Sequence, residues 1–132
     1  MSGTSSSTTI LDTATGTGVS EGIGQLSHLG AFTFHNDFTS FGFTAPNTFS
    51  YTLTTTWVAA NGDEIFTTGT ATGRLTATGN ESTLVSTITG GSGRFADASG
   101  TFTTSVSSVV VSNVGTLATL HDVETHEGQI SY

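Results

Sequence analysis

The segment from Thr48 to Val58 restricts the fold of this chain more than any other part of its sequence. Large side chains at Phe49, Tyr51, Leu53 and Trp57 alternate there with serine and threonine. A two-residue period places alternate side chains on opposite faces of an extended strand, whereas an apolar helix face repeats every three to four residues. We therefore expect a strand, with these four large side chains facing the interior.

The same alternation recurs along the chain between glycine-rich and asparagine-rich turns, and no segment has the period of an amphipathic helix. Strands are predicted at residues 8–15, 26–38, 48–58, 64–78, 82–89, 100–112 and 116–132. Loops are expected at 16–24 and 41–47, and a disordered N-terminal tail at 1–7. Roughly seven or eight strands at hairpin spacing are typical of an antiparallel sandwich or a closed barrel. The prediction is one all-β domain over residues 8–132.

The composition excludes several classes of partner. The net charge of −8 comes from ten carboxylates against Arg74 and Arg94, and lysine is absent. Such a chain lacks the basic surface that binds nucleic acid or anionic membranes. No apolar run is long enough to insert into a membrane. A high content of threonine (29 residues) suits outward strand faces that stay soluble with little charge.

The compartment is left open by the sequence. The absence of cysteine gives no information on redox environment. The first residues have neither a basic region nor an apolar stretch, so they do not form a signal peptide. The expectation is a cytoplasmic protein if this N-terminus is native, and a secreted one if a signal peptide has been trimmed.

A glycine-rich corner separates two of the predicted strands. The run Ile88–Phe102 reads ITGGSGRFADASGTF, with alternating residues on either side. It is not a phosphate-binding loop, which requires GxxxxGK[ST], and no helix follows it as in a dinucleotide fingerprint. Glycines at this density allow a tight turn with positive φ. We expect Phe95, the one aromatic residue of the corner, to plug one end of the molecule.

This corner resembles a known family signature. ITGGSGRFADASG is similar to the TGGSGxFxxxxG segment of allene oxide cyclases and the GGTGxFxxxxG segment of dirigent proteins. It is closer still to the ITGGTGRFAGATG run of mostly uncharacterised bacterial proteins expected to share that barrel. Weaker similarity covers Gly73–Gly79, Leu26–Gly30 and Gly128–Tyr132. The resemblance implies a single eight-stranded, calycin-type antiparallel barrel with essentially no helix, and a homo-oligomer.

The resemblance and the strand phase together give candidate site residues. His28 is in phase with Phe32 and Phe34, which would point it into an apolar lumen; the alternative is a hydrogen-bonded histidine at the rim. Asn36 lies in FHNDF, which loosely resembles the PFTNKLY segment whose asparagine lines the cyclase cavity. The candidate catalytic residues are His28, Asn36 and Tyr51, and the candidate substrate-binding residues are Phe32, Phe34, Phe49, Leu53 and Trp57. No metal or cofactor is expected.

Two function classes follow. The first is a barrel that binds a hydrophobic small molecule in its lumen, as a cofactor-independent cyclase or isomerase that restricts its substrate's conformation. The second is a non-catalytic, secreted binding or structural barrel with a packed lumen. The first strand carries only Asp12 where the cyclases have a glutamate, which supports the second class. We nonetheless expect the first class, because the aromatic face is larger than a barrel of this size needs and Phe41 and Phe43 lie in a loop that could cover one mouth. An apolar cavity above about 300 Å³ would favour the first.

One further segment is dense in polar groups. His121–Glu127 reads HDVETHE, so Asp122, Glu124 and His126 share one strand face. Such i, i+2 spacing is compatible with a shared metal ion. A solvated acidic edge strand that resists edge-to-edge pairing is the simpler interpretation, and we expect it here.

Overall fold

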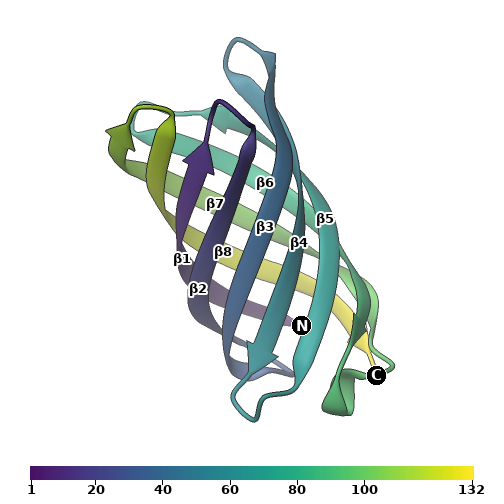
Figure 1. The fold of residues 1–132 in the computed structure, drawn as a ribbon. Helices are drawn as coiled ribbons and strands as arrows, with labels where there is room; N and C mark the ends of the chain where they lie inside the picture. Colours follow the sequence, from purple (N-terminus) through teal and green to yellow (C-terminus); the bar gives the residue numbers. More distant parts are fainter.

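The structure is a computed structural model that describes all residues from Met1 to Tyr132. It is a closed antiparallel barrel in which each strand pairs with its sequence neighbours and β8 returns to β1 (Figure 1). The predicted all-β fold class is confirmed. The strands are β1 (Ser2–Asp12), β2 (Thr17–Leu26), β3 (Gly30–Ala45), β4 (Thr48–Ala59), β5 (Glu64–Leu75), β6 (Gly79–Gly91), β7 (Ser99–Val114) and β8 (Leu117–Ser131). The remaining element is a 3₁₀ turn, η1 (Gly93–Phe95).

Three segments predicted to be irregular are strands. The expected tail at 1–7 belongs to β1, which pairs with both β2 and β8. The expected loops at 16–24 and 41–47 lie largely within β2 and the distal half of β3. Residues 1–7 and 16–24 are rich in serine and glycine, and 41–47 contains Pro46 and Asn47, so these segments lack the sustained apolar alternation from which strands were predicted. Closure of the barrel supplies the backbone partners that hold them extended.

The glycines of β2 leave room for the aromatic rings of β3. Gly18 is registered with Phe38 and Gly22 with Phe34. A Cβ atom at Gly18 would lie 2.5 Å from the Phe38 ring, and one at Gly22 would lie 2.6 Å from the Phe34 ring. Since real Cβ atoms do not approach so closely, β2 can cover these rings only with glycine. The pairing of small with large residues fills the space between β2 and β3.

Apolar side chains fill the two ends of the barrel interior. Phe95 in η1 is fully buried (0 % exposed) and packs at the end that also holds both chain termini (Figure 1), as the glycine corner predicted. We call this end the Phe95 cluster; it comprises Leu26, Leu29, Phe32, Phe34, Trp57, Ala59, Ile65, Ile88, Phe95, Ala98 and Phe102. The second group, the Leu53 cluster, comprises Leu11, Phe38, Leu53, Ala71, Leu84, Ala118 and Leu120.

The inward face predicted for β4 agrees with the structure. Phe49, Leu53 and Trp57 are buried, and Tyr51 is half-buried against the Leu53 cluster. Burial of each large apolar side chain contributes roughly 2–3 kcal/mol.

Candidate functional site

A belt of polar side chains separates the two apolar clusters inside the barrel. On three strands a single polar residue stands between members of the two clusters: Asn36 on β3, Thr55 on β4 and Ser86 on β6. On β8 the belt is formed by three successive inward residues, Asp122, Glu124 and His126. The polar belt comprises Ser5, Ser7, Thr9, Ser20, Asn36, Thr55, Thr67, Ser86, Thr104, Ser108, Asp122, Glu124 and His126.

The two carboxyl groups of the belt are held by hydroxyl groups of β1 and β7. Asp122 accepts hydrogen bonds from Thr9 and Ser108, each at 2.5 Å. Glu124 Oε1 lies 2.8 Å from Ser5 Oγ. Ser7 Oγ lies between the two acids, 2.9 Å from Asp122 Oδ2 and 2.6 Å from Glu124 Oε2. Adjacent acidic residues of one strand are therefore joined through a serine of its neighbour.

The Ser7 bridge limits how the two acids can share hydrogen bonds. A hydroxyl group has one proton to donate, so Ser7 can donate to only one of the two carboxyl groups. The second contact becomes a hydrogen bond only when that carboxyl donates to Ser7. Asp122 already has two other donors, so a proton on Glu124 gives both contacts of Ser7 a donor. Burial raises the pKa of Glu124, and the charge of Asp122 raises it further, while the serine hydrogen bonds lower it.

His126 is the third belt residue of β8 and is neutral. Its Nε2 lies 2.8 Å from Ser5 Oγ, and its Nδ1 lies 2.8 Å from Thr104 Oγ1. Its ring meets Trp57 edge-on, with centroids 5.3 Å apart. Burial away from water lowers its pKa to about 4. Nε2–H donates to Ser5, and Thr104 donates to Nδ1. Each polar group in the hydrogen-bonded series Thr104, His126, Ser5, Glu124, Ser7 and Asp122 then has a partner.

The interpretation of His121–Glu127 as a solvated edge strand is wrong. β8 pairs with β7 on one side and with β1 on the other, so the closed barrel has no edge at this position. Asp122, Glu124 and His126 continue the inward face of Ala118 and Leu120, and all five are buried. That phase was the signal in the sequence that the polar residues point inward. No group of three or more histidine or acidic side chains is placed so that it could hold a metal ion.

One small cavity lies against the belt. Its volume is about 40 Å³, room for one or two water molecules. It is lined by Ser20, Phe34, Asn36, Phe38, Tyr51, Leu53, Thr55, Trp57, Leu84, Thr104, Val106, Glu124 and His126. The polar belt and residues of both apolar clusters therefore meet at this small cavity.

Two of the three predicted catalytic residues lie at this cavity. Asn36 accepts a hydrogen bond of 2.6 Å from Thr55. Tyr51 Oη lies 3.5 Å from Ser82 Oγ. Burial raises the pKa of Tyr51, and the nearby carboxyl groups of Asp122 and Glu124 raise it further, against the hydrogen bond from Ser82. Tyr51 and Asn36 are thus neutral hydrogen-bonding groups beside Glu124.

His28 does not lie in the lumen, so its predicted position is wrong. It sits in the turn between β2 and β3 and is exposed, with φ of 76°. Its Nδ1 lies 3.3 Å from the hydroxyl of Tyr132 at the rim. The left-handed residue breaks the two-residue phase after Leu26, and Leu29 becomes the buried residue of the turn. The alternative interpretation, a hydrogen-bonded histidine at the rim, matches this geometry.

The five predicted substrate-binding residues are all buried, but only three of them line the small cavity. Phe34, Leu53 and Trp57 line the small cavity, whereas Phe32 and Phe49 do not. Trp57 donates from Nε1 to Thr67 Oγ1 at 3.0 Å. The sequence interpretation missed Ser5, Ser7 and Ser20, which fell in the expected tail and loop. Their alternation with outward residues was the available signal.

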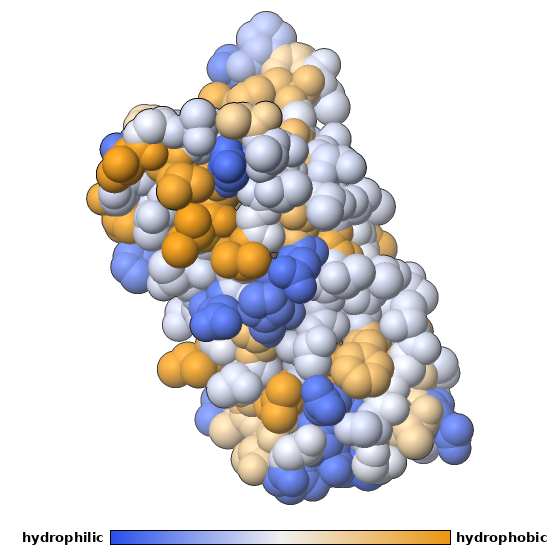
Figure 2. Space-filling view, in the orientation of Figure 1, coloured by the Kyte–Doolittle hydropathy of each residue, from blue (hydrophilic) through white to orange (hydrophobic).

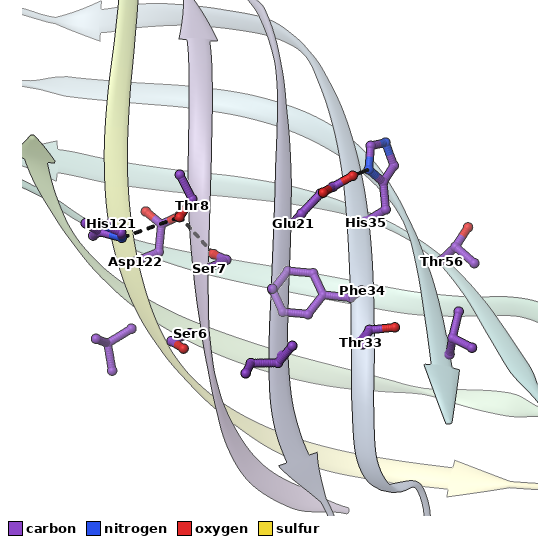
Figure 3. Close-up of a pocket in the computed structure, with 14 residues that line it drawn as sticks. Ser6, Ser7, Thr8, Glu21, Thr33, Phe34, His35, Thr56, His121 and Asp122 are labelled. Carbon is purple, nitrogen blue, oxygen red and sulfur yellow. Dashed lines mark hydrogen bonds and ion pairs between the residues drawn. The ribbon is translucent and has the colours of Figure 1, made fainter. Parts of the chain in front are cut away.

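A larger hollow lies on the outer wall of the barrel. It spans β8, β1, β2, β3 and β4, has a volume of about 770 Å³ and is lined mostly by polar side chains (Figure 3). Glu21 and His35 point toward each other there, 3.2 Å apart, and Asp37 lies 3.2 Å from the other nitrogen of His35. Partial desolvation lowers the pKa of His35, but the hydrogen bonds to both carboxylates outweigh it and raise the pKa.

Comparisons with protein-family models, with curated proteins and with solved structures find no match to this chain. Helices long and apolar enough to cross a bilayer are absent from the structure.

Proposed function

We propose that this protein is a binding or structural barrel whose lumen is filled by its own side chains and whose outer wall makes its contacts. The observation that carries the proposal is the size of the internal void. A lumen cavity of about 40 Å³ is far below the roughly 300–1,000 Å³ of small-molecule pockets. The hollow on the outer wall, at about 770 Å³, is much larger.

The hydrogen bonds inside the lumen support the same proposal. No buried side-chain nitrogen or oxygen lacks a hydrogen-bond partner. Pockets that recognise a ligand keep a few polar groups directed at it. Here Asn36, Glu124 and His126 already have protein partners, so a ligand would have to displace these contacts in order to bind.

A second candidate function is cofactor-independent cyclisation or isomerisation of a hydrophobic substrate inside the lumen. One observation favours it: a buried carboxyl group (Glu124), a phenol (Tyr51) and an amide (Asn36) surround the same cavity between aromatic rings. Such groups stabilise developing charge in a dry site. This function requires an opened barrel, because the cavity shown here has no room for a substrate.

Native mass spectrometry of freshly purified protein distinguishes the two candidates. A filled barrel gives only the mass of the polypeptide and of its assemblies. A retained small molecule that competes with added apolar compounds would overturn the proposal and favour the lumen enzyme. Glu124→Gln is the matched variant for that outcome, since it keeps the shape of the side chain and removes the acid.

A further inference from the structure

The β7–β8 hairpin extends beyond the rest of the barrel wall on one side. Pairing of β7 with β6 ends at Val109, opposite Gly79. One further bond joins Val110 N–H to Thr78 O at 3.0 Å. β7 continues to Val114, paired only with β8. We call residues 111–114 of β7 the valine edge; on the side away from β8, its backbone has no strand partner.

Aliphatic side chains surround the valine edge and are exposed. Val111 is 51 % exposed and Val114 is 71 % exposed. The surface continues across the neighbouring strands through Leu117, and through Ile10 and Val19, which face each other in register. Figure 2 shows this apolar area at the upper left, where Figure 1 places the β7–β8 hairpin. Contiguous apolar patches on a soluble protein mark interaction sites.

The valine edge also lies in an uncharged stretch of the chain. No charged residue occurs between Asp97 and Asp122, whereas the protein as a whole carries −8. Edge strands of soluble proteins usually carry lysine, proline or another charge that blocks pairing. The valine edge has none of these. Since copies of a protein with a net charge of −8 repel each other, an uncharged edge is a place where two copies can meet without like charges in contact.

We propose that the valine edge pairs with the valine edge of a second copy of this chain, antiparallel and about a two-fold axis, so that β7 joins two barrels into one dimer. A two-fold contact uses the same surface on both copies, and the free backbone groups of each edge then find partners in the other. The exposed side chains of Val111 and Val114, which belong to the edge itself, are partly covered in the same contact. This inference rests on the proposed function, in which the outer surface binds.

The test is sedimentation velocity of the full chain over two orders of magnitude in concentration, because a dimer of this kind follows mass action. The wild type is expected to approach twice the monomer mass as its concentration rises. Val111→Lys with Val114→Lys places charges on both edges and should leave a monomer. Val123→Lys is the matched control, because Val123 is an equally exposed valine (63 %) on the outer wall of β8; it should still dimerise.

Far-UV circular dichroism and melting temperature confirm that each variant is folded. A wild type that stays monomeric would overturn the inference while leaving the packed-lumen proposal intact. A dimer that survives in the double lysine variant would also overturn it, since the contact would then lie elsewhere. Binding of monomeric wild type to phosphatidylcholine vesicles would assign the apolar surface to lipid instead.

Discussion

Ser7 Oγ joins two buried acids, at 2.6 Å from Glu124 Oε2 and 2.9 Å from Asp122 Oδ2. Acids two positions apart on one strand are next neighbours on the same face, so two negative charges here would repel at close range in a poorly solvated interior. A proton on Glu124, donated to the serine of β1, removes this repulsion, and burial raises the pKa of Glu124 in that direction. The polar belt is compatible with a packed barrel when Glu124 carries this proton.

Removal of the bridging hydroxyl tests this arrangement. Ser7→Ala leaves a buried carboxyl group short of a partner, and we expect a loss of about 2–3 kcal/mol in the free energy of unfolding. Ser6→Ala is the matched control, because Ser6 is the adjacent residue and is exposed. Urea unfolding of both variants gives the comparison. Equal, small effects would mean that the bridge contributes nothing.

Glu124 should make the protein less stable as pH rises. Its pKa in the folded state is raised above the ordinary value of 4.5, so above that pH the folded state binds more protons than the unfolded state. Stability from this group is therefore present at low pH and lost as pH rises through the folded pKa, by at most about 1.4 kcal/mol per pH unit. The difference in unfolding free energy between wild type and Glu124→Gln should fall as pH rises from 4.5. A difference independent of pH would contradict the raised pKa.

The contribution of His126 to stability should change with pH in the opposite direction. Its pKa falls from 6.5 to about 4 on folding, so between these values the unfolded state binds more protons and stability rises with pH. The difference between wild type and His126→Gln should grow from pH 4 to 6.5 in the same urea experiment. Above pH 4.5 the two residues therefore change the stability of the wild type in opposite directions where their titrations overlap. A slope of the same sign for both variants would refute this balance.

The packing of β2 against the rings of β3 gives a steric prediction. Gly22→Ala would place a Cβ atom 2.3 Å from the Ser6 carbonyl oxygen and 2.6 Å from the Phe34 ring. Overpacking of this kind destabilises by about 1–3 kcal/mol. Gly42→Ala on β3 is the control, since nothing lies within 4 Å of its Cβ position. Thermal melts that show equal stability for both variants would refute the close approach.

The sequence predicted the fold through two features: the alternation of Phe49, Leu53 and Trp57, and the glycine corner around Phe95. It predicted residues 8–12 of β1 as a strand, but not residues 1–7 or most of β2, because the inward residues there are mainly serine and glycine. The small residues of β2 make room for the rings of β3, and the serines of β1 bond the acids of β8. Neither role can be read from β1 and β2 alone, because the partners come from other strands. For the same reason Asp122 and Glu124 were placed on the surface: their partners, Ser5 and Ser7, come from the other end of the chain.

His28 shows a different limit. Its phase with Phe32 pointed it inward, but phase is lost wherever a turn intervenes, and the left-handed conformation at His28 lies within such a turn. Asn36 and Tyr51 lie on uninterrupted stretches of β3 and β4, and their inward position followed directly from the alternation.

Melting temperatures of wild type and Trp57→Ala with added indole test the packed lumen most directly. Trp57 is buried beside the small cavity, so its truncation should cost about 3–5 kcal/mol and leave an apolar hole of indole shape. We predict that indole raises the melting temperature of Trp57→Ala and leaves that of wild type unchanged. Stabilisation of the wild type by indole, or by another apolar compound of that size, would contradict a lumen filled by its own side chains.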